Sequence, residues 1–534
     1  MKCLGFGIAM MLAIAPSATA QHEHSEGVKV GTVSFETSCK PETRAGFNRS
    51  VALMHSFEFS SAIEGFNTVL TVDPNCAMAY WGIALSHWAN PFAGIKTGPL
   101  LERGLAAADR GLATGAPTSR ERAYLLAVRE LYKDSTNVPH RDRTIAYAKA
   151  MEALHRDYRS DDEARIFYAL ALDPTALPTD KTYAVQLQAA ELLAPLLQKY
   201  PNHPGLAHYM IHTFDVPALA PKALSAARSY AAIAPDAPHA LHMPSHTFTR
   251  VGLWQESVDT NIRSENESVR LGYTAEALHA MDYQVYAYLQ MAQDSKAKAV
   301  VDRMKKVAAN LDLTVFKGAA PPSAGAYGRS AIEARSILER GAWQEAASLQ
   351  PITTPFLYPD AVTYFARALS AARGGRPADA APDAAKLGSL RDALKAAKDE
   401  YWAGQVEIQR QIVEAWVAFA EGKKDDAVTQ MRAAADAEDA SDKAAVTPGP
   451  LAPARELLGE MLLDAGRAKE ALAAFETTMQ KEPNRFRGAY GAARAAEALG
   501  DRALARKHYQ HVLAIAKNSD NQRLELKRAR AFVN

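Results

Sequence analysis

The sequence predicts an all-α protein: a helical-repeat superhelix, or α-solenoid, made of two repeat blocks. Three observations predict it. The 534 residues are 48% apolar but only 8% aromatic, and alanine, the strongest helix former, supplies much of the apolar share. A pattern of small and large residues recurs near the C-terminus at an interval of about 34 residues, the length of one helix–turn–helix unit. No stretch alternates apolar and polar residues with the period of two that a half-buried strand requires.

The charge balance excludes two classes of function. Lysine and arginine together number 61, and aspartate and glutamate together number 60. A near-neutral chain lacks the basic surface by which nucleic acids and anionic membranes are bound. No apolar run reaches the roughly 18 residues that a membrane-spanning helix needs. We therefore expect no nucleic-acid partner and no segment that spans a membrane.

The first 40 residues are predicted to form a leader and a tail. Lys2 precedes an apolar stretch at 4–15, and the small residues Ala18-Thr19-Ala20 follow it. This order is typical of a secretory signal peptide that is cleaved after residue 20. We therefore predict a signal peptide at 1–20, an N-terminal tail at 21–40, and a periplasmic or secreted mature protein.

Two cysteines, Cys39 and Cys76, remain after removal of the predicted signal peptide. In an oxidising compartment they can form a disulfide, which would stabilise the fold by roughly 3 to 4 kcal/mol. Two independent buried thiols fit the sequence equally well. Both interpretations stay open at this point.

A first repeat block is expected at residues 41–316. Ala62, Phe66 and Pro74 keep the mutual offsets of the C-terminal repeats, which indicates a helix pair. Thr118-Ser119-Arg120-Glu121 is a capping-box pattern that opens a further helix.

The second repeat block is expected at 331–520, after a Gly-, Ala- and Pro-rich linker at 317–330 and before a C-terminal tail at 521–534. Its best repeat unit contains Leu458, Gly459, Leu462, Gly466, Ala471, Phe475 and Pro483. A shift of about 34 residues gives the next unit, with Ala492, Ala493, Ala496, Gly500, Ala505 and Tyr509. Stacked units of this kind form a twisted array with a long concave groove.

Histidines are concentrated in one segment, because seven of the 15 lie within 203–279. His208 and His212 are four residues apart, and so are His242 and His246. Side chains four apart on a helix lie on one face, with Cβ atoms about 6 Å from each other. The interval between the two pairs equals the repeat length, so the pairs occupy equivalent positions in consecutive repeats.

These pairs predict a metal site in the groove. If residues 205–214 and 238–251 form the first helices of consecutive repeats, imidazoles from both can converge on one divalent ion such as zinc or copper. The candidate ligands, including the nearby His239, His279 and two carboxylates, are His208, His212, His239, His242, His246, His279, Asp215 and Asp282. Buried histidines that only form hydrogen bonds, or that bind an anionic or aromatic ligand without metal, are the alternatives.

The chain also resembles a known family. The strings that carry the resemblance are Phe47-Asn48-Arg49, His55-Ser56-Phe57, Ala77 to Gly82, His208-Tyr209 with His212, His242 to His246, Tyr401-Trp402 with Gln405 to Arg410, and Val446 to Gly449. With these strings the chain is similar to bacterial exported tetratricopeptide-repeat (TPR) proteins of unassigned biochemical activity. The resemblance implies a TPR-like fold and export, and it implies no particular chemistry.

Three functions follow from these patterns. The first is a non-enzymatic scaffold whose groove binds a protein, a peptide or another ligand, and the second is a metal-binding protein. The third is a metal-dependent enzyme in which three histidines hold the ion and Asp215 or Asp282 acts as the base. No phosphate-binding loop, nucleophile elbow, HExxH or dinucleotide-binding fingerprint is present in the sequence. The sequence therefore favours a non-enzymatic protein and names no catalytic residue.

Overall fold

The computed structural model describes residues 28–96, 98–521 and 523–534. Within these residues the protein consists of α-helices, short 3-10 helices and loops, and it contains no strand. The predicted all-α fold is confirmed. The predicted signal peptide at 1–20 lies outside the described residues.

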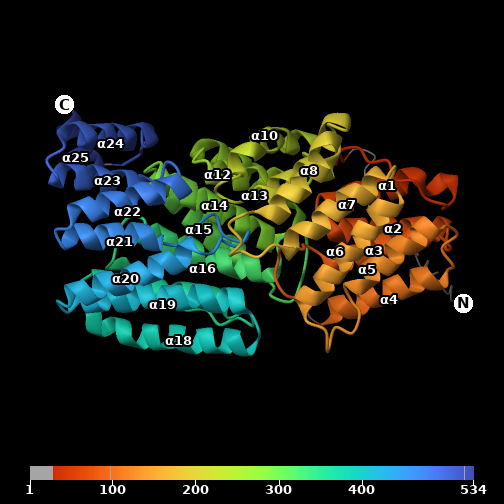
Figure 1. The fold of residues 1–534 in the computed structure, drawn as a ribbon, viewed down its shortest axis with the longest axis horizontal. Helices are drawn as coiled ribbons and strands as arrows, with labels where there is room; N and C mark the ends of the chain where they lie inside the picture. Colours follow the sequence, from red (N-terminus) through yellow and green to blue (C-terminus); the bar gives the residue numbers. More distant parts are fainter. Residues whose placement is uncertain (1–27, 97, 522) are drawn as a thin grey trace, which may run out of the picture.

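The helices follow one another along the chain, and longer connections precede the helices that begin at Pro322, Tyr358 and Ala454 (Figure 1). In the N-terminal half they are α1 Arg44–His55, α2 Phe59–Val72, α3 Ala77–Trp88, α4 Pro99–Ala113, α5 Ser119–Glu130, α6 His140–Asp157, α7 Asp162–Leu172, α8 Ala184–Lys199, α9 Pro204–Thr213 and α10 Leu224–Ile233. The middle of the chain contains α11 Pro238–His242, α12 Pro244–Arg250, α13 Trp254–Leu271, α14 Thr274–Gln290 and α15 Asp294–Ala308. The C-terminal half contains α16 Pro322–Leu338, α17 Tyr358–Arg373, α18 Ala381–Ala396, α19 Glu400–Ala420, α20 Lys424–Asp439, α21 Ala454–Asp464, α22 Ala468–Lys481, α23 Phe486–Ala498, α24 Arg502–Ile515 and α25 Leu524–Val533. The 3-10 helices are η1 Pro41–Thr43, η2 Asp173–Thr175, η3 Ala220–Ala223, η4 Glu345–Ser348 and η5 Pro377–Ala380.

Glycines opposite aromatic rings set the close packing of the helix pairs. A Cβ atom on Gly82 would lie 2.3 Å from the Phe66 ring. In the C-terminal repeats, Cβ atoms on Gly459 and Gly491 would lie 2.8 and 2.3 Å from the Phe475 ring. No larger residue fits at these positions without moving a helix. The small and large residues of the predicted repeats therefore meet across helix pairs, as the repeat pattern requires.

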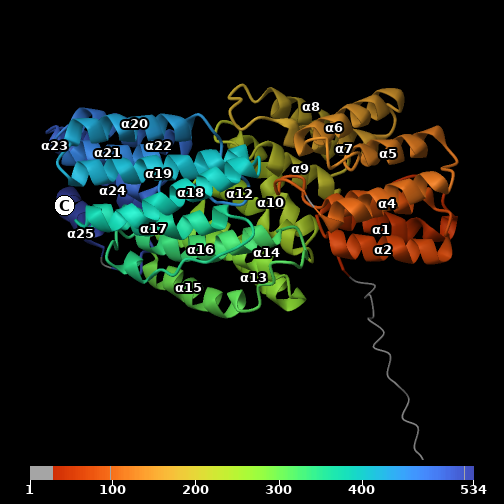
Figure 2. The same cartoon turned by 90° about the horizontal axis from the view of Figure 1, so that it is seen from below.

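The last repeats fold back onto the middle of the chain (Figures 1 and 2). Trp254 Nε1 at the start of α13 donates to the carbonyl of Asn484, at 2.9 Å. Arg523, just before α25, forms an ion pair with Asp294 at the start of α15. The C-terminal half is therefore a curled array whose end contacts α13 and α15.

The segment 440–453, between α20 and α21, lies on the inner side of this curl. Arg335 of α16 donates to the carbonyls of Gly449 and Pro450, at 2.8 and 2.9 Å. Tyr283 Oη of α14 donates to the carbonyl of Thr447, at 3.3 Å. The segment 440–453 therefore packs against α14 and α16.

Two predicted boundaries are wrong. Residues 317–330 are not an irregular linker, because α16 begins at Pro322; a proline at the first position of a helix has no N–H group to leave unpaired. Residues 521–534 are not a free tail. They contain α25, in which Leu526 and Ala529 are fully buried against the preceding repeat.

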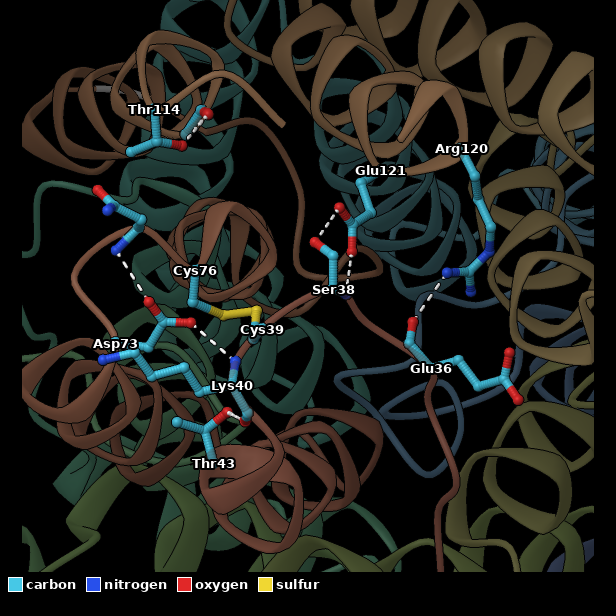
Figure 3. Close-up of a disulfide and its surroundings, with 12 residues drawn as sticks. Glu36, Ser38, Cys39, Lys40, Thr43, Asp73, Cys76, Thr114, Arg120 and Glu121 are labelled. Atoms are coloured by element: carbon cyan, nitrogen blue, oxygen red, sulfur yellow. Dashed lines mark hydrogen bonds between the residues drawn. A yellow bond between two sulfur atoms is a disulfide. The ribbon is translucent and has the colours of Figure 1, made fainter. Parts of the chain in front are cut away.

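The segment 28–40 is a packed strap and not a tail. Val30, Val33 and Phe35 are buried in the N-terminal core. Cys39 forms a disulfide with Cys76, with the two Cα atoms 4.9 Å apart, which decides between the two interpretations of the cysteines (Figure 3). The disulfide fastens the strap to the start of α3.

Among the described residues, no helix is both long enough and apolar enough to cross a bilayer.

Candidate metal centre

The six predicted histidines are buried and lie on four neighbouring helices. Their exposed fractions range from 0 to 8%. They are His208 and His212 on α9, His239 and His242 on α11, His246 on α12, and His279 on α14. Helix α12 packs against both α9 and α14, so repeat stacking brings all six into one region. The helix predicted at 238–251 is interrupted at Met243, because Pro244 has no N–H group to continue the hydrogen-bond ladder.

The structure divides these histidines into two groups. The first histidine trio is His208, His212 and His239, and the second histidine trio is His242, His246 and His279. Within each trio, one ring nitrogen from each residue lies within 4.8 Å of the other two. The trios are adjacent, since the ring centroids of His212 and His246 are 6.0 Å apart.

Hydrogen bonds orient two rings of the first histidine trio. Nδ1 of His208 lies 2.6 Å from the carbonyl oxygen of His55, so it carries the proton and donates. Nδ1 of His239 lies 3.0 Å from a carboxylate oxygen of Glu276, to which it donates. The other Glu276 oxygen accepts the N–H of Ala320, at 2.6 Å. These partners leave the Nε2 lone pairs of both histidines free.

The Nε2 atoms of the first histidine trio have no partner. Those of His208, His212 and His239 are all buried without a hydrogen bond. A buried polar atom without a partner costs roughly 1 to 3 kcal/mol. Three such atoms within one cluster therefore require an explanation.

In the second histidine trio two Nε2 atoms face each other. Nδ1 of His242 donates to Oδ1 of Asn261, at 2.7 Å, and the Asn261 amide is fixed because its Nδ2 donates to Ser257. Nδ1 of His246 donates to Asp215, at 2.9 Å. Both Nε2 atoms therefore present lone pairs, and they are 3.0 Å apart. Two lone pairs at this distance repel unless a cation lies against both.

The third ring of this trio completes the cluster. Nδ1 of His279 is buried and has no hydrogen-bond partner. Its ring centroid lies 4.4 Å from that of His242. The Oη of Tyr283 lies 3.4 Å from His246 Nε2, so a phenol adjoins the nitrogens as well.

All six rings are neutral at pH 7, because their pKa values are lowered. Burial is the largest cause, and it lowers the pKa of all six histidines. For His239 burial and the neighbouring His246 lower the pKa to about 3. Neutral imidazole is the form that binds a metal ion.

Asp215 acts as a support for His246 and not as a free ligand. It also accepts Nε of Arg250, at 2.8 Å, and pairs with Lys443 of the segment 440–453, at 3.3 Å. Burial acts to raise the pKa of Asp215, but Lys443 and Arg250 outweigh it and hold the pKa well below its usual range. A carboxylate in this state is a weak base.

Asp282 does not join the histidines. It forms a fully buried ion pair with Arg335 of α16, with Nε and Oδ1 at 2.8 Å. Helix α14 is buried on all sides, and Arg335 of the neighbouring α16 takes up the Asp282 carboxylate, so Asp282 is not available as a ligand beside His279. Neither Asp215 nor Asp282 lines the adjacent cavity, and the predicted role as a catalytic base has no support from either.

A cavity of about 870 Å³ adjoins both trios. Its lining includes His212 and His239 of the first trio and His246 and His279 of the second. Each trio therefore has a side that is accessible to a ligand.

Several residues that orient the histidines or Asp215 were not predicted from the sequence. Glu276, Asn261 and Lys443 orient histidines or Asp215 from other helices or from the C-terminal half. Glu276 lies only three residues before His279, and this short spacing could have identified it from the sequence. Nothing in the sequence links residue 261 to His242 or residue 443 to Asp215.

A third cluster of buried histidines was also missed. Glu163 accepts Nε2–H of both His55 and His203, each at 3.0 Å, and Tyr209 Oη donates to Nδ1 of His55, at 2.7 Å. Although burial raises it, the pKa of Glu163 is lowered to about 2 by His203 and His55. We call this the carboxylate-bridged cluster. The Nε2 atoms of His55 and His203 in this cluster already have a hydrogen-bond partner in the protein, the carboxylate of Glu163.

The two histidine trios fit a transition-metal ion. Zinc binds imidazole nitrogen at about 2.0 to 2.1 Å, so two nitrogens on one tetrahedral ion are about 3.4 Å apart. Nitrogens that lie within 4.8 Å of one another need to approach by at most about 1.4 Å to reach that separation. The Nδ1–H donors to a carbonyl, an amide and two carboxylates are the supports that metal-binding histidines usually have.

Comparisons with known proteins assign no family. No family model matches the chain, and no curated protein matches it. Among solved structures the chain is similar to the APC/C hetero-tetramer Cut9–Hcn1, at 13% identity and a TM-score of 0.33, over 92% of this chain and 96% of that one. It is also similar to Naa15/Naa10 bound to HypK-THB, at 11% identity and a TM-score of 0.23, over 91% of this chain and 73% of that one. At these values neither likeness assigns a ligand or an activity, and the helical-repeat fold rests on the arrangement of the helices themselves.

Proposed function

We propose that the protein is an exported helical-repeat scaffold of the TPR type that binds two divalent transition-metal ions, one at each histidine trio. Zinc and copper are the ions that neutral imidazole ligands suit best. The stacked repeats fix the four helices that carry the ligands, and the hydrogen bonds to Nδ1 atoms fix the ring orientations.

One observation carries this proposal: buried ring nitrogens converge without a protein partner. Three are the Nε2 atoms of the first histidine trio, and two more are the facing Nε2 atoms of His242 and His246. A proton could separate the second pair, but burial lowers the pKa of both rings. A metal ion would satisfy all of these lone pairs at once.

Two further observations support export. The leader at 1–20 has the charge, apolar stretch and small residues of a signal peptide. The Cys39–Cys76 disulfide is the kind of cross-link that persists in the periplasm or outside the cell. The protein or peptide partner expected from the sequence stays a prediction.

The test is the metal content of the full-length mature chain. The protein is stripped with a chelator, reloaded with zinc or copper, freed of excess ion and subjected to elemental analysis. We expect two ions per chain, and a His242→Ala/His246→Ala double variant should retain only one. A His508→Ala variant is the matched control, because His508 is buried in α24 and belongs to no trio. Equal metal content in the double variant and in the wild type would refute the proposal.

A further inference from the structure

The cavity beside the histidine trios has a polar floor and apolar walls. Imidazoles from both trios line the cavity, so a ligand inside it lies beside both trios. Small-molecule sites in proteins usually enclose about 300 to 1,000 Å³, and this cavity measures about 870 Å³. The space therefore suits a small molecule.

Aromatic side chains from both halves of the chain form the walls. Phe92, in the loop after α3, stacks on His212 with ring centroids 4.1 Å apart. On the other side, Tyr358 and Trp402 stack face to face, at 4.0 Å and 5°. Phe92, Tyr358 and Trp402 all line the cavity, so a flat apolar ligand would find ring faces to pack on.

Exposed apolar groups at the same cavity also lack a partner. Ile95 and Val315 line it, and their exposed fractions are 47% and 43%. Apolar side chains that gather at one concave site are typical of ligand-binding surfaces. An apolar ligand would cover them.

The charge of the loaded site determines the other end of the ligand. Imidazole ligands are neutral, so each divalent ion would keep its full charge in a buried site. Of the nearest carboxylates, Glu276 offsets part of this charge, whereas Asp215 is already paired with Arg250 and Lys443. A buried charge needs a counter-charge.

The cavity lining supplies very little of that counter-charge. Among the described residues that line it, the only acidic one is Asp399. Its Oδ1 accepts the N–H of Trp402 at the start of α19, at 3.3 Å, which places it at a helix terminus. The negative charge must therefore come from the ligand.

We propose that the cavity binds a small aromatic anion, with an anionic oxygen at the metal ions and the ring against the aromatic wall. Aromatic carboxylates and phenolates share this chemistry. The proposal rests on the proposed metal sites, and it goes beyond them by naming the ligand class.

The test uses calorimetric titration of the zinc-loaded full-length chain with three probes. Benzoate carries both features, acetate lacks the ring, and benzyl alcohol lacks the charge. We expect benzoate to bind about tenfold or more tightly than either of the others. Removal of zinc should abolish benzoate binding.

Variants test the wall separately from the metal. Trp402→Ala should weaken benzoate binding about tenfold and leave acetate binding unchanged. Phe92→Leu is a second wall variant with the same expected direction, in case Trp402→Ala fails to fold. Trp343→Ala is the matched control, because Trp343 does not line the cavity, and it should change neither affinity.

Zinc content measured on the same samples separates the two proposals. If the chain holds two zinc ions but binds benzoate no better than acetate, or binds it equally without zinc, the ligand proposal is wrong and the metal proposal stands. If the chain holds no zinc, both are wrong.

Discussion

Two buried histidine clusters lie side by side in the N-terminal half, and they differ in what satisfies the ring nitrogens. In the carboxylate-bridged cluster, Glu163 accepts a hydrogen bond from both His55 and His203. In the first histidine trio, the carboxylate of Glu276 binds only the Nδ1 side of one ring, and the three Nε2 atoms are buried without a partner. The carbonyl of His55 also orients His208, so the two clusters share a residue.

This difference shows how burial and residue type alone fail to define a function. Both clusters are composed of buried histidines with carboxylates nearby. A carboxylate between two rings makes a structural ion-pair network, whereas a carboxylate behind a ring leaves the lone pair available to an external cation. The position of one acidic residue therefore separates the two chemistries.

The largest effect is expected from Glu163→Gln. Loss of the charge that bridges His55 and His203 should lower the free energy of unfolding by about 3 to 5 kcal/mol, because two buried donors lose their ionic acceptor. Zinc content should stay at the wild-type value. Urea unfolding and elemental analysis measure the two quantities, and a loss of bound zinc would show that the clusters work as one unit.

Acid should weaken the carboxylate-bridged cluster in a defined range. The pKa of Glu163 falls from 4.5 to about 2 on folding, so its contribution is fully present above pH 4.5 and is lost as the pH falls through 2. The difference amounts to about 3 kcal/mol. Unfolding curves between pH 5 and pH 2 should show a smaller loss of stability for Glu163→Gln than for the wild type. Parallel pH profiles for the two proteins would contradict this assignment.

A smaller effect is expected from Glu276→Gln in the first histidine trio. The amide still accepts the Nδ1–H of His239 but makes the ring a weaker ligand, so the affinity of this site for zinc should fall by about 10 to 100-fold. The second histidine trio serves as an internal control, because its supports are Asn261 and Asp215. Competition with a zinc-binding dye would resolve the two sites, and equal weakening of both would argue against separate sites.

The smallest effect is expected from His212→Phe in metal-free protein. The new ring keeps the stacking on Phe92 and removes a buried nitrogen that has no partner. In the presence of a chelator, the free energy of unfolding should stay the same or rise by up to about 1 kcal/mol. With zinc present, the wild type should become the more stable of the two, because only the wild type binds at the first site. A large loss of stability in the chelator would mean that the trio is a structural cluster.

The sequence was sufficient to predict the helices and the gathering of the six histidines in one region, but it predicted one ion site where the structure divides them into two trios. Spacing by four places His208 beside His212, and the repeat length places α9 beside α12, so local geometry and stacking determine most of the site. The supports could not be predicted in the same way. Asn261 and Lys443 approach from other elements, and their positions depend on packing between helices that the sequence pattern does not specify.

The wrong predictions each have a physical origin. The Gly-, Ala- and Pro-rich stretch at 317–330 resembles a linker, but small residues also allow close helix contact. Gly325 and Gly328 of α16 approach the backbone of α14, where added Cβ atoms would lie 2.9 and 2.7 Å from its atoms. Asp282 was named as a candidate ligand because it is close to His279 in the sequence, which does not reveal that Arg335 of α16 pairs with it.

The contact of the last repeats with α13 and α15 changes how this array should unfold. A linear stack of repeats depends on nearest neighbours and can fray from either end. Here Trp254 is bound to Asn484 and Asp294 to Arg523, so residues more than 200 positions apart in sequence hold the C-terminal end in place. The terminal repeats cannot unfold one at a time without first breaking these contacts. We therefore expect the region from α13 to the C-terminus to unfold as one cooperative unit.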